Sequence, residues 1–330
     1  MRKVTIKDVA LEAGVSVATA SNALNNPDIV RPQTRIQVLA AAERLAYVPN
    51  ANGKRLRAKH SRTIGLFVNS MSGEYYGALA DSMYRVCRDN GYELHICMVS
   101  DIASIQQKLR DHTLDGAVVF VDNLDKPAVE RMIASDCPLV FLGMEERGAR
   151  VSSILYESME HGRMAARYLL GLGKRRLMHV FGLPGNYDSE MRSRGFLEEL
   201  KSRGVDPAGV RQLEGRFERA AAYREMRRYL QEGNGVPDAI FAANDLSATG
   251  CMTALNEAGY RIPDDVSVMG CDDITLCEYL TPGLTTIRTN FQRTGAQAAG
   301  EVLRLIRGEP GRVLPQSGEL VVRQSCAISK

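Results

Sequence analysis

Apolar residues in the first fifty positions recur at helical spacing and are separated by short polar breaks. Asp8 lies three residues after Thr5, which is the pattern of a capping box, and Ser16 can act as the N-cap of a following helix. The spacing predicts three helices, over about residues 6–13, 17–24 and 32–45. Two short helices joined by a Gly-containing turn and backed by a third form the helix-turn-helix arrangement.

From Thr63 onward, short apolar runs alternate with stretches of helical spacing. The runs that we interpret as strands are TIGLFV, YELHICMV, DGAVVFV, PLVFL, RLMHVFG, DAIFAAN and DVSVMG. This alternation predicts parallel sheets built from βαβ units. Because about 270 residues exceed what a single hydrophobic core usually holds, we expect two α/β lobes.

The stretch AYVPNANGKRLRAKHSR separates the two regions. Its Val-Pro step favours extended backbone, Asn50 can cap a following helix, and five basic residues come after it. The sequence therefore predicts a helix-turn-helix head over residues 1–48, a basic hinge or linker over 49–62 and a core over 63–330.

The net charge of +3 conceals an uneven distribution. Residues 1–62 contain eleven Lys/Arg and four Asp/Glu, a net charge of +7, so the rest of the chain carries −4. A basic segment with apolar periodicity beside a mildly acidic body is typical of a nucleic-acid-binding head on a sensor or an enzyme. The alternative is a merely solvated basic tail.

The seven cysteines are scattered and include no CxxC pair, which predicts reduced thiols rather than a disulfide framework or a zinc site. No run of about 18 apolar residues indicates a membrane span, and the charged N-terminus lacks the apolar region of a signal peptide. We therefore expect a cytoplasmic protein with no membrane partner, no metal and no other cofactor.

The second predicted helix has two faces with different chemistry. A helical wheel places Ala20, Ala23 and Leu24 inward, and it places Val17, Ala18, Ser21 and Asn22 outward. Asparagine can bond the N6 and N7 atoms of adenine in the major groove, and small apolar side chains can contact the thymine methyl group. Phosphate contacts supply most of the affinity, and the linker and four basic residues, Lys3, Lys7, Arg31 and Arg35, are available for them. This helix therefore predicts a base-reading surface, with Asn22 favouring adenine.

Together these motifs resemble the LacI/GalR family of bacterial transcription regulators. The strings that carry the resemblance are TIKDVALEAGVSVATASNALN, RPQTRIQVLAAAERLAYVPN, IGLFV, GRMAARYLLGLG, RSRGF, AIFAANDLSATG, IPDDVSVMGCDD and LTPGLTTIR. They cover nearly the whole chain. The resemblance implies an all-α helix-turn-helix head and an α/β periplasmic-binding-protein-like core of two doubly wound parallel-sheet lobes, with a small-molecule effector held between the lobes.

The resemblance also implies a homodimer that binds double-stranded, pseudo-palindromic operator DNA. It places the first lobe at about residues 63–158 and 288–313, and the second lobe at about 159–287 and 314–330. The residues that it implies for DNA contact are Thr5, Ser16, Val17, Ala18, Thr19, Ser21, Asn22, Asn25, Arg31, Tyr47, Asn50, Gly53, Lys54 and Leu56.

In such proteins the linker folds into a short hinge helix on DNA. The resemblance places this helix over Asn50 to Leu56, with Leu56 entering the minor groove, where an apolar wedge kinks the duplex at the cost of unstacking. A helix of two turns is unstable alone, so its folding can report that DNA is bound. Gly53 stands where alanine is usual and weakens such a helix by about 1 kcal/mol. The alternative is a disordered basic linker.

Ligands of open α/β sheets bind beyond the carboxyl ends of strands, and the candidates here follow such ends. Through the resemblance they are Asn69, Tyr75, Tyr76, Arg192, Phe217, Asn244 and Asp272. Arg, Asn and Asp side chains fix hydrogen bonds, and an aromatic face covers the apolar side of a sugar ring. This chemistry suits a polyol, a sugar, a sugar acid or a nucleobase. The neighbouring Asp273 is predicted to be structural.

Several of these residues also have a purely structural interpretation. The two tyrosines could be core aromatics, and Asn244–Asp245 could be only a helix N-cap. Arg192 has the firmest case for ligand contact, because a buried arginine otherwise needs a partner carboxylate. The chain departs from the family's pattern at Glu157–Ser158 and Cys271, so the effector cannot be copied from a relative.

Two other functions remain open on the residues alone. A glycosidase could use Asp245 and Asp272 as paired carboxylates, and a cytoplasmic sugar-binding protein could use the same cleft without any DNA role. No HExxH, GxSxG or P-loop motif is present, and neither function explains the basic head. We therefore predict an effector-controlled, DNA-binding transcriptional regulator of the repressor type, and not an enzyme.

Overall fold

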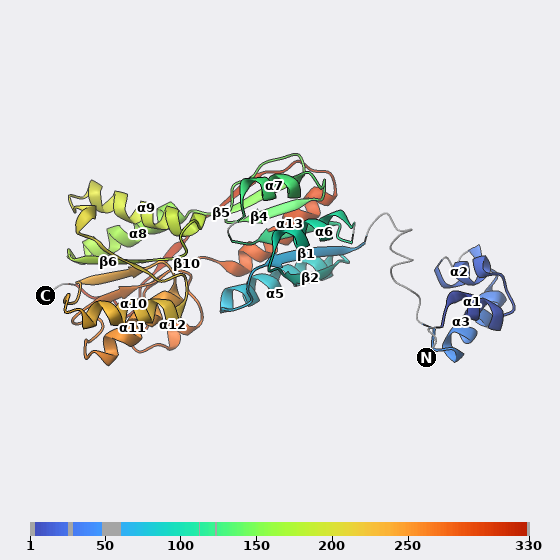
Figure 1. Cartoon of the computed structure of the whole chain (residues 1–330), viewed down its shortest axis with the longest axis horizontal. Helices are drawn as coiled ribbons and strands as arrows, with labels where there is room; N and C mark the ends of the chain where they lie inside the picture. Colours follow the sequence, from blue (N-terminus) through green and yellow to red (C-terminus); the bar gives the residue numbers. More distant parts are fainter. Residues whose placement is uncertain (1–3, 26–28, 48–60, 112, 123, 329–330) are drawn as a thin grey trace. The chain divides into compact units, whose positions relative to one another are not determined.

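The computed structural model describes residues 4–25, 29–47, 61–111, 113–122 and 124–328. The chain divides into two compact units, Met1–Ser61 and Arg62–Lys330, each with its own core. We refer to them as the head and the core unit, and Figure 1 labels their elements.

The head contains the three helices that the sequence predicts, each within one residue of the predicted ends. They are α1 (Ile6–Glu12), α2 (Val17–Asn25) and α3 (Pro32–Arg44). The predicted capping box is confirmed, because the Thr5 backbone N–H donates to the Asp8 carboxylate at 2.8 Å. Ser16 caps α2 by accepting the Thr19 N–H at 3.0 Å. Small buried residues such as Ala20 and Ala41 let the helices pack closely.

The first lobe of the core unit is built on a six-stranded parallel sheet in the order β11-β5-β4-β3-β1-β2. Its strands are β1 (Thr63–Val68), β2 (Glu93–Met98), β3 (Gly116–Phe120), β4 (Leu139–Leu142), β5 (Val151–Tyr156) and β11 (Val313–Gln316). Its helices are α5 (Glu74–Asp89), α6 (Ile102–Arg110), α7 (Lys126–Ile133) and α13 (Phe291–Ile306). Alternate residues of the central strands meet α5 and α13 on one face and α6 and α7 on the other. Burial on both faces explains why these strands are continuous apolar runs.

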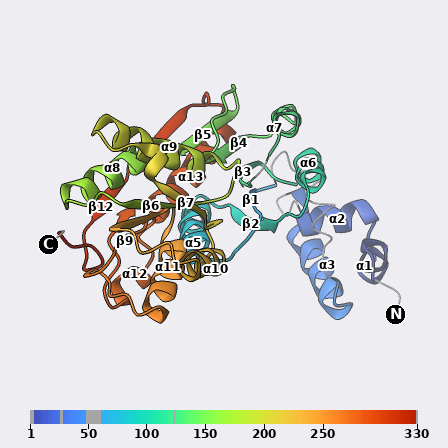
Figure 2. The same ribbon diagram turned by 60° about the vertical axis from the view of Figure 1, so that its left-hand side comes forward.

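The second lobe repeats this plan around a four-stranded parallel sheet in the order β7-β6-β8-β9. Its strands are β6 (Leu177–Phe181), β7 (Arg211–Glu214), β8 (Ala239–Ala242) and β9 (Ser267–Met269). Its helices are α8 (Ser158–Gly171), α9 (Tyr187–Ser202), α10 (Arg219–Gln231), α11 (Asp245–Glu257) and α12 (Leu276–Tyr279), with a 3₁₀ turn at Pro207–Gly209. In Figures 1 and 2, α8 and α9 lie on one side of β6, and α10 and α11 lie on the other.

Three segments join the lobes. The chain passes from β5 to α8, from β10 (Thr286–Arg288) to α13, and from β11 to β12 (Glu319–Val321). β10 and β12 pair antiparallel in a small sheet of their own. The predicted boundary was at about residue 313. Strand β11 pairs with β5 from Val313 through Gln316, so the first sheet continues to Gln316.

The seven strands predicted from apolar runs are all confirmed, whereas β5, β7, β10, β11 and β12 were not predicted. Among the described residues, no helix is both long and apolar enough to cross a membrane.

Helices α8 and α9 approach each other unusually closely through two glycines. A Cβ atom on Gly162 would lie 2.0 Å from the Arg192 carbonyl oxygen, and one on Gly195 would lie 1.9 Å from the Met159 carbonyl oxygen. Only a residue without a side chain fits such backbone contacts. The glycine of the RSRGF motif therefore fixes the position of α9, which carries Arg192.

Candidate functional site

The outward face of α2 is small and largely free of charge. Ser16, Val17 and Ala18 are exposed, and Ser21 and Asn22 are half-buried. Ala20 and Ala23 are buried on the opposite side, as the helical wheel predicts. The exposed face therefore offers a hydroxyl, two small apolar side chains and, at its edge, the Asn22 amide, which are groups that can meet base edges in a major groove.

The other predicted DNA residues of the head take positions at helix ends. The Thr5, Ser16 and Thr19 side chains take part in capping bonds, and the Asn25 amide donates to the Ser21 carbonyl at 2.9 Å. Arg31 is exposed at the start of α3. Tyr47 packs against the core of the head, a role that the sequence did not indicate. The predicted hinge residues Asn50, Gly53, Lys54 and Leu56 lie outside the described residues.

A cavity of about 600 Å³ in the core unit is lined by residues of both lobes. All seven predicted effector residues line it: Asn69, Tyr75, Tyr76, Arg192, Phe217, Asn244 and Asp272. The first three come from the first lobe and the last four from the second. This volume is within the range of pockets that hold small molecules.

Aromatic rings form one wall of the cavity. The ring centroids of Tyr75 and Tyr76 are 4.0 Å apart, and Phe291 at the start of α13 lies 5.0 Å from Tyr75. Tyr76 also belongs to the hydrophobic core of the first lobe, so it is both a core aromatic and a residue that lines the cavity. Phe217 faces the cavity from the second lobe, and its ring lies against Gly182, where a Cβ would come within 2.2 Å of it.

Asn244 combines both roles that the sequence left open. Its Oδ1 accepts the Ser247 N–H at 2.9 Å and caps α11, while its Nδ2 donates to the Phe217 carbonyl at 3.1 Å. Arg216 and Phe217 both have φ near +55°, a conformation that L-residues adopt at a cost. Asn244 therefore stabilises the strained loop that presents the Phe217 ring.

Arg192 is 4% exposed and lines the cavity. Its Nη1 donates to the Ala243 carbonyl, and its Nη2 lies 3.5 Å from the Ser158 hydroxyl. Among the described residues, no carboxylate forms an ion pair with it, and its Nε is buried without a hydrogen-bond partner. A buried guanidinium in this state retains donors for a ligand.

Besides the exposed Glu218, two acidic residues that the sequence did not single out, Asp122 and Asp188, line the same cavity as Asp272. Asp122 accepts the Asn186 amide at 2.6 Å, and Asp188 accepts the Ser158 hydroxyl at 2.7 Å. Burial raises the pKa of all three aspartate carboxyl groups, most strongly that of Asp272. Asp122 lies two residues after the end of strand β3, so the rule of strand ends could have identified it, whereas Asp188 lies within the first turn of α9 and gave no such signal.

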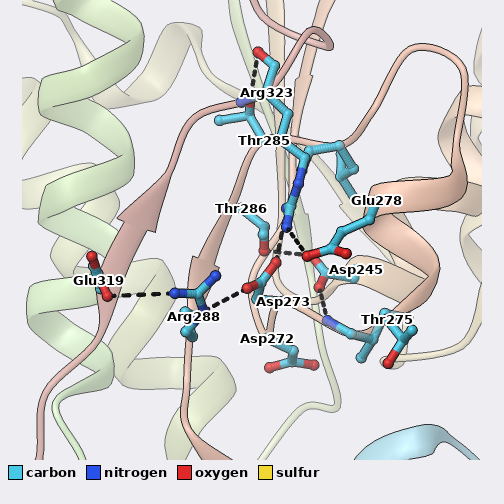
Figure 3. Close-up of polar contacts among 12 residues, drawn as sticks. Asp245, Asp272, Asp273, Thr275, Glu278, Thr285, Thr286, Arg288, Glu319 and Arg323 are labelled. Atoms are coloured by element: carbon cyan, nitrogen blue, oxygen red, sulfur yellow. Dashed lines mark hydrogen bonds and ion pairs between the residues drawn. The ribbon is translucent and has the colours of Figure 1, made fainter.

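Asp273 is structural, as predicted. Its carboxylate lies 2.6 Å from Arg288 Nε on β10 and 2.8 Å from Arg323 Nη1 near the C-terminus. Figure 3 shows Arg288 between Asp273 and Glu319, with Asp272 standing apart from this network. The neighbouring aspartates therefore have different functions: one fixes the segments that join the lobes, and the other is left for the cavity.

The carboxylate pair of the glycosidase alternative is not available. Asp245 is 0% exposed, accepts the Thr286 hydroxyl at 2.6 Å and the Ile274 N–H at 3.0 Å, and does not line the cavity. Among the described residues, no group of three or more His, Cys, Asp or Glu side chains is arranged to hold a metal ion.

Comparison with known proteins assigns both units. The model of bacterial regulatory proteins, lacI family, matches residues 5–50, and a periplasmic binding protein-like domain matches residues 166–326. The chain belongs to the lacI family. This lacI-family protein combines a helix-turn-helix head with a two-lobed, periplasmic-binding-protein-like core.

Three related proteins match along almost the whole chain. The HTH-type transcriptional repressor PurR of Vibrio vulnificus (strain CMCP6) is 31% identical over 328 residues, which cover 97% of this chain and 98% of PurR. The lac repressor dimer bound to operator and the anti-inducer ONPF is 26% identical with a TM-score of 0.78, covering 99% of this chain and all of that one. A complex of the regulator CelR with cellobiose is 26% identical with a TM-score of 0.73, covering 98% and 100%.

This lacI-family protein is therefore a DNA-binding transcriptional regulator that responds to a small-molecule effector, and it is not an enzyme.

Proposed function

We propose that the protein is a cytoplasmic, homodimeric repressor whose operator affinity is controlled by a small polar metabolite in the cavity of the core unit. The observation that carries this proposal is the convergence of all seven predicted effector residues, from both lobes, on one cavity. Cleft sites between lobes are the usual place for ligands in open α/β folds.

Exposed apolar residues on the core unit support the homodimer. Strand β2 is an edge strand of the first sheet, and its Ile96 and Met98 side chains are 45% and 65% exposed. On the second lobe, Tyr279 of α12 is 77% exposed. Each lobe thus has apolar residues suited to a second copy, and a twofold pair of heads would fit an operator with two half-sites.

Contacts between the lobes suggest how the effector acts. The Asn186 amide of the second lobe donates to Asp122 of the first, and the Thr275 N–H of the second lobe donates to the Glu74 carboxylate of the first at 2.7 Å. A ligand that binds one lobe arrangement better than another shifts their populations. We infer that this shift reaches DNA through the hinge over residues 49–62, where Leu56 acts as a wedge.

Asn22 is expected to read one adenine per half-site. Asn22→Ala removes the bidentate contact, which is worth about 1–3 kcal/mol of discrimination, but leaves the phosphate contacts intact. Affinity should therefore fall by roughly 5–150-fold for each half-site, which is about 30-fold to 10⁴-fold for a homodimer on two half-sites, while affinity for random DNA stays the same. Selection of operators from a random library, followed by fluorescence anisotropy at fixed salt, measures both. Equal losses on specific and random DNA would instead assign Asn22 to the DNA backbone.

Effector control is tested on the same operator. Anisotropy of the full chain on DNA is measured with and without individual sugars, sugar acids and purines. A ligand that changes the operator affinity and also raises the melting temperature supports the proposal. A ligand that stabilises the protein without changing its DNA affinity would contradict effector control.

A further inference from the structure

Acidic side chains outnumber basic ones in the cavity lining. Asp122, Asp188 and Asp272 line the cavity together with Arg192, which is the single buried cation among the described residues that line it. Two further arginines line it, but both are engaged elsewhere. Arg216 pairs with Glu214 at 2.7 Å, and Arg219 donates to the Thr253 hydroxyl at 3.4 Å.

Of these three aspartates, Asp272 has the fewest side-chain partners. Among the described residues, no hydrogen bond or ion pair involves its carboxylate, and its backbone is held at φ +128° by bonds to the segment that joins the lobes. Arg192 and Asp188 of α9 and Asp245 of α11 act electrostatically on it. It also interacts with the side chains of Tyr75, Tyr156 and Cys271. A carboxylate with free acceptor capacity needs donors from a ligand.

We propose that the cavity selects an uncharged, hydroxyl-rich ligand of the sugar or polyol class and rejects the corresponding carboxylates and phosphates. This inference rests on the proposed function, because it takes the cavity to be the effector site.

A hydroxyl group can satisfy both kinds of group in the cavity. It can donate to the Asp272 carboxylate and accept from the Arg192 guanidinium, and both residues line the cavity. Neighbouring hydroxyls on a ring can reach Asp188 and Asp122 in the same way, and the Tyr75 and Phe217 rings can cover the apolar face of that ring.

An acidic ligand meets the opposite situation. Its carboxylate could bond Arg192, but it would also lie near Asp122, Asp188 and Asp272, where burial already disfavours the charged form and raises the pKa of each carboxyl group. A further negative charge adds to that cost. Specificity of this kind comes from the repulsive contact as much as from the attractive one.

The first test needs no knowledge of the ligand. Asp272→Asn keeps the shape and tolerates the positive φ, and it removes one negative charge. Because the pKa of Asp272 is raised in the folded protein, its ionised form opposes folding at neutral and higher pH, and this effect disappears once the carboxyl group is protonated. The melting temperature of the variant should therefore exceed that of the wild type at pH 8 and approach it at pH 4.

The matched control is Asp264→Asn, whose side chain is 49% exposed beside Arg261 and should change little at either pH. A lower melting temperature for Asp272→Asn at pH 8 would overturn the proposal, because it would show that Arg192 already compensates this carboxylate.

The second test compares matched ligands on the wild-type full chain. Thermal shifts and titrations are measured for glucose, galactose and ribose, for cellobiose, for glucuronate, galacturonate and the corresponding sugar phosphates, and for hypoxanthine. The best ligand should be uncharged, and its affinity should be at least about 100-fold above that of the corresponding uronate or sugar phosphate. In Asp272→Asn, the ratio of these two affinities should be smaller. A uronate, a phosphate or hypoxanthine as the best ligand would overturn the inference.

Failure of the underlying function has a different result. If no member of the panel shifts the melting temperature or the operator affinity, none of these compounds is the effector. The melting temperatures of Asp272→Asn and the wild type still decide the charge preference of the cavity. If a neutral sugar binds but leaves the operator affinity unchanged, the charge preference stands and effector control fails.

Discussion

Gly195→Ala is expected to lower the melting temperature of the core unit by roughly 2–12 °C. The added Cβ would lie 1.9 Å from the Met159 carbonyl oxygen, so α8 and α9 must move apart. Overpacking a tight core costs about 1–3 kcal/mol and occasionally more, and the clash here is with backbone, which cannot rotate away. For a chain of this size, each kcal/mol corresponds to about 2–4 °C.

Differential scanning calorimetry of the full chain measures this effect, with Gly300→Ala as the matched control. Gly300 lies inside α13, and a Cβ there has no atom within 4 Å, so alanine should stabilise the helix by about 0.5–1 kcal/mol. Both substitutions raise helix propensity, so a lower melting temperature for Gly195→Ala and a higher one for Gly300→Ala would assign the loss to the contact between α8 and α9. Equal effects of the two substitutions would refute the close helix contact.

Asp245→Ala is expected to be the second severe change, with a loss of about 2–4 kcal/mol. It leaves the Ile274 N–H and the Thr286 hydroxyl buried without their acceptor, and each such group costs about 1–3 kcal/mol. Burial raises the pKa of Asp245, so removal of this carboxyl group also relieves a desolvation cost and offsets part of the loss. The net result should be a core that unfolds at lower temperature and binds effector poorly.

Asp245→Asn tests whether the hydrogen bonds to the Asp245 side chain account for the loss of stability. It keeps one acceptor oxygen and the side-chain shape, so its stability should lie between those of the wild type and Asp245→Ala in chemical denaturation. If Asp245→Ala were as stable as the wild type, the hydrogen bonds to Ile274 and Thr286 would not be the reason why an aspartate occupies this position.

The sequence predicted helices and central strands well because burial on one stripe or on both faces leaves a clear pattern. Strand β1 is buried at every position and reads as TIGLFV. Strand β5, VSSILY, was not predicted because two serines interrupt the apolar run. They are nevertheless buried, with Ser152 bonded to Glu301 and Ser153 bonded to the backbone near Glu146. The short strands β10 and β12 carry Arg288 and Glu319 and have no apolar pattern of their own.

The candidate site followed a similar logic. Residues just after predicted strands, such as Asn69 and Asn244, were identified because the topology of a parallel sheet brings strand ends together. Phe291 reaches the cavity from a segment that returns from the second lobe to the first, and no local pattern reports such a return. The positive φ of Asp272 also depends on contacts distant in sequence.

The late return of the chain has a consequence for protein synthesis. The head has a closed hydrophobic core by Tyr47. The first sheet, in contrast, needs β11, and the second lobe needs Ser325, whose hydroxyl bonds the backbone of Val268 and Thr285. Domains emerge from the ribosome in order, at about 5–20 residues per second. A nascent chain, or one truncated before its last few residues, therefore carries a formed head without a finished sensor.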